Sequence, residues 1–369
     1  MFQNKNVILF MPFIGGGGVE KNLFLISNFL SKKLSKIILV TSSKKYKKKF
    51  DKKVIFLTPE KNLSERLNIR FKYIVCLYIL FKFLLKNKNS IVLSFQANIY
   101  CIILCKIFGI KIISRSNSSP SGWYHNFLKK YIYKIIINMA NLIIVNSKEF
   151  KTEMKKKFNV DSICIYNPLN KNEILKNSKR KIKFKYFENK KNLKILNIGR
   201  LTEQKDQLTL LKAINRIKNH KLNIKVLIIG RGIEKKNLKL FINNNNLNNI
   251  VKIINFKDNP YPYIQKCDLF ILTSKYEGLP NVLLEAALLK KFIISSECPT
   301  GPKEILNNGE SGYLFKVGDY KELSSKILKF VENKKEVRRK IINAYKNLNR
   351  FNYKKNMKLY YLAIKEFIT

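Results

Sequence analysis

The chain is short of acidic residues, of histidine and of closely paired cysteines. Among its 369 residues, 24 are Asp or Glu and 73 are Lys or Arg, which gives a formal net charge of +49. Because there are only two histidines, we do not expect a metal site built on imidazole. No C-x-x-C pair occurs, so we expect reduced and mostly buried thiols, as in the cytoplasm. The six cysteines stand at positions 76, 101, 105, 164, 267 and 298.

Long apolar runs are missing too. No stretch reaches the roughly 18 apolar residues that span a bilayer, and the run from Tyr73 to Leu85 is interrupted by Lys82. The apolar start, Val7 to Ile14, is followed by glycines and then by Val19-Glu20-Lys21, without a small-x-small cleavage pattern. This pattern predicts a first buried strand rather than a signal peptide. We therefore expect a protein that is soluble or peripheral to a membrane.

The excess of positive charge favours an anionic partner, either nucleic acid or an anionic membrane surface. Compositional bias explains the charge equally well, because lysine is spread over the whole chain and other biased runs occur, such as Asn243 to Asn246. A nucleic-acid-binding protein would need a groove with exposed aromatics or a recognised module, and the sequence contains neither. An anionic lipid surface would attract this chain whatever the origin of its charge.

Short apolar strands alternate with helices along the chain. A length of 369 residues favours two domains over one core. The alternation predicts an α/β fold with parallel sheets that are covered by helices on both faces. The turn-forming run Tyr166 to Asn170 marks the junction between the two series of strands. After it, the highly charged segment Lys171 to Lys191 is expected to be exposed.

Two glutamates frame the stretch Ser274 to Ala287. Glu277 lies in a loop after an apolar strand, and Glu285 lies about one turn into a helix that we expect to begin at Pro280. Amides at the helix start can bind an anion, and carboxylates can bind hydroxyls, which suits a sugar nucleotide. The alternative is the acid–base pair of a glycoside hydrolase, which needs its carboxyls about 5–9.5 Å apart. That alternative leaves the two motifs described next unexplained.

A glycine run and a pair of cations provide further candidates. Gly15 to Gly18 lie between a strand and a helix, where bare backbone can approach a ligand; they match neither G-x-G-x-x-G nor a P-loop. In the second half, Arg200 follows a strand, and we expect Lys205 in the first turn of a helix from Glu203 to Lys218. Cations at a helix start are unfavourable by about 0.3–1 kcal/mol each. They make sense if an anion such as phosphate lies between them.

Taken together, these residues resemble glycosyltransferase family 4, whose members have the GT-B fold. The resemblance covers nearly the whole chain and rests on Gly17 to Lys21, on Gly199-Arg200-Leu201 with Lys205, on Leu227 to Gly232, and on Glu277 to Ala286. It implies a retaining transferase with a cleft between two Rossmann-like domains. The first, residues 1–168, would bind the acceptor, and a C-terminal helix within residues 350–369 would cross back onto it. The second, residues 169–349, would bind the nucleotide sugar.

The resemblance also implies roles for individual residues. Arg200 and Lys205 would hold the donor diphosphate, Glu277 the donor sugar and Glu285 the ribose; of these, Arg200, Lys205 and Glu277 would be catalytic. A metal or other cofactor is then not required, and the sequence has no Asp-x-Asp motif. The remaining donor-side candidates are Gly16, Gly17, Phe256, Gly278, Asn281 and Val282.

A finer resemblance, to bacterial enzymes that extend sugars on undecaprenyl diphosphate, rests on Ser114 to Asn117, Asn259-Pro260-Tyr261 and Cys298 to Ile305. It implies a UDP-sugar donor, with N-acetylgalactosamine or another N-acetylhexosamine as a candidate sugar, and a polyprenyl-diphosphate-linked acceptor. The product would be a surface glycan such as O-antigen, capsule or glycoprotein glycan. The expected location is the inner face of the cytoplasmic membrane, on anionic lipid and without a specific nucleic-acid partner.

Many family members carry a catalytic histidine in the first domain. The matching loop here is Arg115 to Asn117, so no such histidine is carried over. Arg115, Asn117 and the isolated His125 are the acceptor-side candidates. Epimerases or phosphorylases with the GT-B fold remain the alternative to a transferase.

Overall fold

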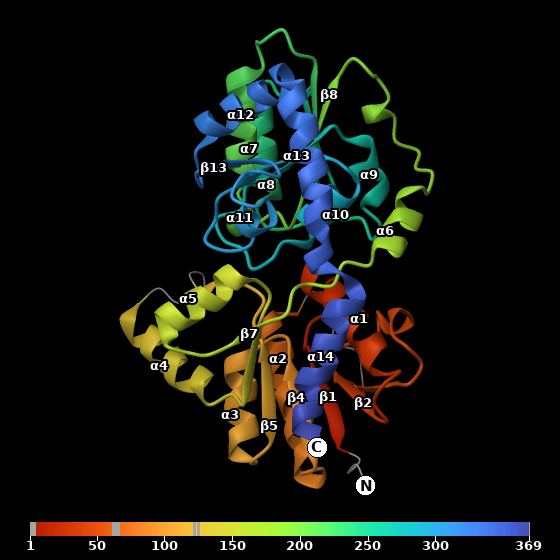
Figure 1. Cartoon of the computed structure of the whole chain (residues 1–369), viewed down its shortest axis with the longest axis vertical. Coiled ribbons are helices and arrows are strands. Elements are labelled where there is room, and N and C mark those ends of the chain that lie inside the picture. The colour runs from red at the N-terminus through yellow and green to blue at the C-terminus, as the bar shows by residue number, and fades with distance from the viewer. Residues whose placement is uncertain (1–4, 61–66, 121–122, 124–125, 369) are drawn as a thin grey trace. The chain divides into compact units, whose positions relative to one another are not determined.

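The computed structural model of the protein describes residues 5–60, 67–120, 123 and 126–368. The chain forms two compact units, shown in Figure 1. Unit 1 consists of Met1–Pro168 with Tyr353–Thr369, and unit 2 consists of Leu169–Asn352. Each unit contains a parallel β-sheet flanked by helices, which confirms the predicted α/β fold class.

Unit 1 is built on one parallel sheet. Its elements are β1 (Asn6–Phe10), α1 (Gly18–Leu30), β2 (Ile37–Val40), the 3-10 turn η1 (Lys47–Lys49), β3 (Val54–Leu57), α2 (Ile69–Lys86), β4 (Ser90–Ser94), α3 (Asn98–Ile107), β5 (Lys111–Arg115), α4 (Phe127–Asn138), β6 (Leu142–Val145), α5 (Lys148–Phe158), β7 (Ile163–Cys164) and α14 (Tyr353–Ile368). In the described part of the unit, seven strands lie in the order β3-β2-β1-β4-β5-β6-β7. Val7 of the central strand pairs with Ile37 on one side and Ile91 on the other.

Helices cover both faces of this sheet, because successive side chains of a strand point to opposite sides. Val7 and Leu9 face α1 and α14 and form one core with them. Ile8 and Phe10 face α2 and α3 and form the core on the other face, to which Ile136 of α4 adds. The buried strands therefore read as continuous apolar runs, as the sequence predicts.

Unit 2 repeats this plan with its own sheet. Its elements are α6 (Lys171–Ser178), the 3-10 turn η3 (Lys185–Phe187), β8 (Leu193–Ile198), the 3-10 turn η4 (Glu203–Lys205), α7 (Gln207–Ile217), β9 (Ile224–Ile229), α8 (Lys235–Asn244), β10 (Val251–Ile254), α9 (Tyr261–Lys266), β11 (Leu269–Leu272), α10 (Asn281–Leu288), β12 (Phe292–Ser296), α11 (Pro302–Ile305), β13 (Tyr313–Phe315), α12 (Tyr320–Glu332), α13 (Lys334–Lys346) and the 3-10 turn η5 (Asn347–Phe351). Within the described residues, six parallel strands lie in the order β10-β9-β8-β11-β12-β13.

The structure corrects two local predictions in unit 2. The predicted helix from Glu203 is divided at Asp206, which has a left-handed backbone (φ 45°) and caps α7 through the backbone N–H of Thr209. Lys205 therefore belongs to the preceding 3-10 turn, and the start of α7 carries a carboxylate that suits its dipole. Pro280 precedes α10 as its N-cap residue, so this helix begins at Asn281.

The segment Lys171 to Lys191 is also less exposed than its charge predicts. Phe187 is buried, and the Tyr186 hydroxyl donates hydrogen bonds to the carbonyl oxygens of Ile250 (2.6 Å) and Val226 (3.3 Å). Burial raises the pKa of Tyr186, so this hydroxyl stays protonated. The aromatic side chains thus fasten the segment to unit 2 while its lysines remain at the surface.

Candidate active site

The candidate site lies at the carboxyl edge of the unit 2 sheet. The direction of chain progression reverses between β8 and β11, which are neighbours in the sheet. Open α/β sheets bind ligands outside the carboxyl ends of the strands at such a reversal. The loops that follow β8, β9, β11 and β12 all begin at this edge. They contain most of the predicted donor-side residues of unit 2. The exceptions are Phe256, which follows β10, and the three that belong to α10, namely Asn281, Val282 and Glu285.

Three glycines allow these loops to touch backbone to backbone. A Cβ added at Gly230 would lie 1.9 Å from the carbonyl oxygen of Gly199, and one at Gly232 would lie 2.0 Å from that of Leu201. A Cβ at Gly301 would lie 2.1 Å from the carbonyl oxygen of Gly278. Larger residues cannot occupy these positions without moving the neighbouring backbone. The close packing fixes the loop of Glu277 against the loop after β12.

Glu277 is the centre of a buried polar cluster. Its Oε1 accepts a hydrogen bond from the Ser274 hydroxyl (2.6 Å) and pairs with the Nζ of Lys205. The Thr300 hydroxyl donates to the backbone oxygen of Glu277 at 2.6 Å. The exposed fractions of the Lys205 and Glu277 side chains are 15% and 9%, so both charges are largely removed from water and are held in place by each other. Burial, and then the charge of Glu277, raise the pKa of the nearby Cys298 thiol.

The 3-10 turn η4 is fastened to the loop after β11. The side-chain amide of Gln204 donates a hydrogen bond to the backbone oxygen of Tyr276 (2.9 Å). The backbone oxygen of Gln204 accepts one from the backbone N–H of Lys275 (2.8 Å). The Gln204 side chain also accepts a hydrogen bond from the guanidinium of Arg200 at 3.0 Å. Arg200 is exposed, so its remaining N–H groups can meet a ligand. The turn therefore places two cations, Arg200 and Lys205, beside the Glu277 loop.

Helix α10 begins directly after this loop. Its N-cap residue, Pro280, makes no side-chain capping hydrogen bond, and the first turn carries no acidic residue. Asn281 and Val282 are its first two residues, so their backbone amides belong to the positive end of the helix dipole. Glu285 lies one turn further on and is buried, with 2% of its surface exposed. The two glutamates thus belong to consecutive parts of one loop and helix, as the sequence predicts.

Phe256 lies in the loop after β10 and is half-buried. The guanidinium carbon of Arg231, which comes from the loop after β9, lies 5.3 Å from the centre of the Phe256 ring. A cation–π contact of this kind orders the ring without burying it. The Phe256 ring is therefore available for stacking, but Arg231 already covers part of it.

The glycine loop of unit 1 holds a carboxylate of its own chain. The backbone N–H of Gly15 donates to Oε1 of Glu20 at 3.1 Å, and Gly16 has a left-handed backbone (φ 84°). A Cβ on Gly17 would lie 2.9 Å from Oε2 of Glu20. Glu20 therefore provides negative charge at the start of α1, where an anionic ligand would have to compete with it. Gly16 and Gly17 stay predictions as donor-binding residues.

One acceptor-side candidate, Arg115, needs correction. Arg115 is fully buried in unit 1, where its guanidinium donates to the Tyr360 hydroxyl (2.8 Å) and to Oδ1 of Asn167 (2.7 Å). In this position it joins α14 to the sheet and does not present its charge to an acceptor. Asn117 donates from its side chain to the backbone oxygen of Phe95 (2.8 Å), which ties down the loop after β5. His125 lies outside the described residues.

Sequence reasoning missed the neutral side chains that hold the site together. Thr300, Gln204 and Ser296 each bond a neighbouring loop, Ser296 through the backbone oxygen of Ser274 (2.7 Å). Ser274 bonds Glu277 within its own loop. One signal was available, because small hydroxyl residues cluster directly after β11 and at the end of β12. Among the described residues, no group of three His, Cys, Asp or Glu side chains could hold a metal ion.

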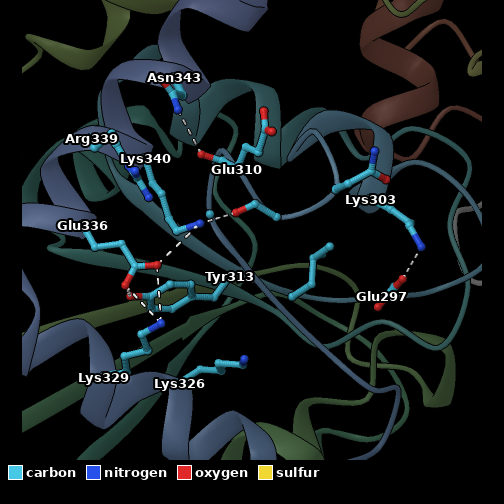
Figure 2. Close-up of a pocket in the computed structure, with 14 residues that line it drawn as sticks. Glu297, Lys303, Glu310, Tyr313, Lys326, Lys329, Glu336, Arg339, Lys340 and Asn343 are labelled. Atoms are coloured by element: carbon cyan, nitrogen blue, oxygen red, sulfur yellow. Dashed lines mark hydrogen bonds and ion pairs between the residues drawn. The ribbon is translucent and has the colours of Figure 1, made fainter.

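A separate polar recess of about 900 Å³ lies beside β13, α12 and α13 (Figure 2). The Glu336 carboxylate accepts a hydrogen bond from the Tyr313 hydroxyl at 2.9 Å and pairs with Lys329 (3.1 Å) and Lys340 (3.6 Å). The residues described along its walls include none of the predicted donor-side positions. Since these charges pair with one another, the recess is explained by the packing of α12 and α13.

Comparison with known proteins shows the enzyme class of this chain. The family described as "Glycosyl transferases group 1" matches residues 178–348, which include all the predicted donor-side residues of unit 2. An uncharacterized glycosyltransferase of Methanocaldococcus jannaschii is 31% identical over 284 residues, which make up 70% of this chain and 68% of that protein. The chain belongs to the group 1 glycosyl transferases. The enzyme class predicted from the sequence is thereby confirmed.

Two further comparisons cover more of the transferase. A Campylobacter jejuni protein named N-acetylgalactosamine-N,N'-diacetylbacillosaminyl-diphospho-undecaprenol 4-alpha-N-acetylgalactosaminyltransferase is 26% identical over 352 residues, 92% of each chain. The crystal structure of Anabaena HepE in complex with UDP and glucose has a TM-score of 0.80 at 18% identity, and the match covers 98% of this chain and 100% of that one. This structural likeness confirms that the transferase has the predicted GT-B fold.

Proposed function

We propose that this transferase is a retaining, metal-independent member of family 4 that moves a hexose or N-acetylhexosamine from a UDP-sugar to a lipid-linked saccharide. The reaction contributes to a surface glycan and takes place at the inner, cytoplasmic face of the membrane. The observation that carries the proposal is the meeting of Lys205, Ser274 and Glu277 at the reversal point of the unit 2 sheet, directly before α10. This arrangement offers fixed positive charge and a carboxylate within one small site.

The proposed donor diphosphate lies between Arg200 and Lys205. An arginine can fork two phosphate oxygens, and a lysine ammonium has three N–H donors, of which one is used by Glu277 here. Negative charge develops on the diphosphate as the glycosidic bond breaks. Fixed cations and the α10 dipole stabilise that charge more in the transition state than in the ground state. Because these cations neutralise the diphosphate charge, the proposed reaction does not need a metal ion.

The carboxylates bind hydroxyls in this proposal. Glu285 accepts hydrogen bonds from the ribose, and Glu277 from the donor sugar. The backbone of Gly278 and the first amides of α10, those of Asn281 and Val282, contact the sugar and the phosphate. Phe256 stacks on the base. The neutral partners of Glu277 keep its carboxylate aimed in one direction, which favours a positioning role over a proton-transfer role.

The acceptor class is supported by the Campylobacter relative, whose name specifies a diphospho-undecaprenol-linked saccharide, and whose match covers 92% of both chains. The donor class is supported by the name of the same relative and by the UDP and glucose in the Anabaena structure. Unit 1 would then bind the lipid-linked acceptor and unit 2 the donor.

Donor binding is tested first by thermal unfolding of the whole protein with a panel of UDP-sugars. A ligand present at about 100 times its Kd adds about 2.7 kcal/mol to the free energy of unfolding of the unit that binds it. Glu285→Gln keeps the side-chain volume but removes one acceptor oxygen, and Arg200→Lys keeps the charge but loses the fork. Each should weaken UDP binding by about 10- to 100-fold, as expected for a hydrogen bond to a charged group.

Arg338→Lys is the matched control, because Arg338 is an exposed arginine of α13 in the same unit. It should leave UDP affinity unchanged. Turnover is followed by product analysis: free UDP, an elongated glycolipid and an α-configured new linkage, all insensitive to EDTA. Full UDP-sugar turnover by the Glu285→Gln protein would contradict the assignment, and interconverted sugar nucleotide without glycolipid would indicate an epimerase.

A further inference from the structure

Unit 1 exposes apolar side chains along three neighbouring helices. Helices α2, α3 and α4 cover the same face of the sheet, and α3 packs against both of the others. Their outer sides, which we call the α2–α3–α4 face, present large apolar residues to solvent. The most exposed are Ile74, Tyr78, Tyr100, Ile107, Phe127 and Leu128, the last three at 72%, 81% and 66%.

Helical spacing shows that this exposure is systematic. In α2, Cys76, Leu80 and Leu84 form a buried stripe, whereas Ile74 and Tyr78 belong to a second apolar stripe that faces outward. A helix that is apolar on both sides is expected to bury both. Contiguous exposed apolar surface of this kind marks an interaction site. The sheet covers the inner stripe, whereas the outer stripe is free to contact another apolar partner.

The charge on these helices is of one sign. Their sequences contain eight Lys or Arg and no Asp or Glu, and all the basic side chains except Lys72 are at least partly exposed. The Lys82 ammonium lies 4.7 Å from the centre of the Tyr78 ring, so charge and apolar surface are interleaved. Lysine stems can lie along apolar surface while their ammonium groups reach outward. This combination is typical of helices that lie in the interface of an anionic bilayer.

Other partners fit this surface less well. Two copies of the chain would bring like charges face to face, which opposes association. Nucleic acid would use the lysines and exposed rings such as that of Tyr78, but the aliphatic residues Ile74, Ile107 and Leu128 offer nothing for bases to stack on and would stay exposed to water. Within the described chain, no helix has the length and hydropathy to cross a membrane. The surface is therefore suited to lie on a bilayer.

We propose that the α2–α3–α4 face docks the protein onto an anionic lipid bilayer, with its apolar side chains at the acyl boundary and its lysines among the headgroups. The docking rests on the proposed function in one respect: a lipid-linked acceptor would require the protein to lie at the membrane surface. Lys44 to Lys49, another basic stretch, does not belong to this face, because its own Tyr46 and the nearby Phe56 pack with the core of α1 and α14.

The test measures binding of the full-length protein to vesicles, by co-sedimentation, in the absence of donor. Vesicles of phosphatidylglycerol and phosphatidylcholine are compared with phosphatidylcholine alone. The test variant changes Lys129, Lys130 and Lys134 of α4 to Gln; the charge-matched control changes the exposed Lys47, Lys48 and Lys52 to Gln. Three cations near the surface contribute on the order of 100-fold in partitioning. We expect that loss for the α4 variant and less than about fivefold for the control.

A second pair of variants tests the apolar part. Phe127→Ser with Leu128→Ser should lower binding to the anionic vesicles at least tenfold, whereas Ile233→Ser with Leu240→Ser, which alters exposed residues of unit 2, should not. Unchanged thermal unfolding verifies that the surface variants are folded.

Three results would overturn the docking. These are equal losses for the two lysine variants, absence of binding to anionic vesicles, and a concentration-dependent dimer that Phe127→Ser with Leu128→Ser abolishes. The Glu285→Gln protein should bind vesicles as the wild type does. Failure of donor turnover and failure of docking are therefore distinguishable.

Discussion

A methyl group at Gly301 should disturb both the stability of unit 2 and the transfer reaction. Gly301 has φ 91° and ψ −61°, a conformation in which an L-residue is strained by about 1–3 kcal/mol. The added Cβ would also lie 2.1 Å from the carbonyl oxygen of Gly278, and overpacking of this kind costs about 1–3 kcal/mol. Together these costs amount to about 4 kcal/mol for Gly301→Ala.

Gly318→Ala is the matched control in the same unit. Gly318 also has a positive φ (78°), but a Cβ there would meet no atom within 4 Å. Its substitution therefore carries only backbone strain, about 1–2 kcal/mol. For a unit of this size, 1 kcal/mol lowers Tm by about 2–4 °C. We expect Tm to fall by about 10 °C for Gly301→Ala and by about 4 °C for Gly318→Ala.

The transfer rate separates the two variants further. The carbonyl that the new methyl group would push belongs to Gly278, between Glu277 and the start of α10. A shift of about 1 Å in a positioned group can lower the rate about 100-fold. UDP-sugar turnover, measured below both melting temperatures, should fall accordingly for Gly301→Ala only. Equal melting temperatures, or normal turnover by a destabilised Gly301→Ala protein, would refute the reasoning.

Two further predictions concern buried charges. Lys205→Met leaves the Glu277 carboxylate with the Ser274 hydroxyl but without its cation, and should destabilise unit 2 by about 2–3 kcal/mol. Breaking a fully buried ion pair would cost more, but here both side chains are partly exposed. Adding Glu277→Gln should restore part of this loss in a thermal double-mutant cycle, and additive effects would contradict the coupling. Tyr360→Phe should cost about 1 kcal/mol and Arg115→Met several times more, since it removes two buried hydrogen bonds from a charged donor. An increased acceptor KM for Tyr360→Phe at low temperature would instead indicate that Arg115 reaches the acceptor.

Local patterns in the sequence were sufficient to predict the parallel sheets and the elements that carry the two glutamates. Apolar strands alternating with helices predicted parallel sheets, and the spacing of Glu277 and Glu285 placed them correctly on a loop and a helix. These features depend on residues close in sequence. The partners of Glu277 do not, because Lys205 is 72 residues away and Thr300 is 23 residues away. Such contacts are set by strand order, which a single sequence does not give.

The errors have physical explanations as well. Arg115 was assigned to the acceptor because its loop resembles the matching loop of the family, but its partner Tyr360 lies 245 residues away and was not foreseeable. Asp206 was an available signal, since it is a favoured N-cap residue, and the predicted helix nevertheless started four residues too early, at Glu203 instead of Gln207. The segment before β8 was judged by its lysines, although Tyr186 and Phe187 determine how it packs.

Because α14 completes unit 1, the order of synthesis and the order of folding differ. Residues Met357, Tyr360 and Ile364 fill the core beneath β1, yet they are translated after the whole of unit 2. Until α14 is synthesised, unit 1 therefore has an open core and an Arg115 side chain that lacks its Tyr360 partner, while unit 2 can already fold. A fragment ending at Pro168 would keep that defect permanently. Unit 1 should consequently be expressed on its own only with the α14 sequence reattached through a linker.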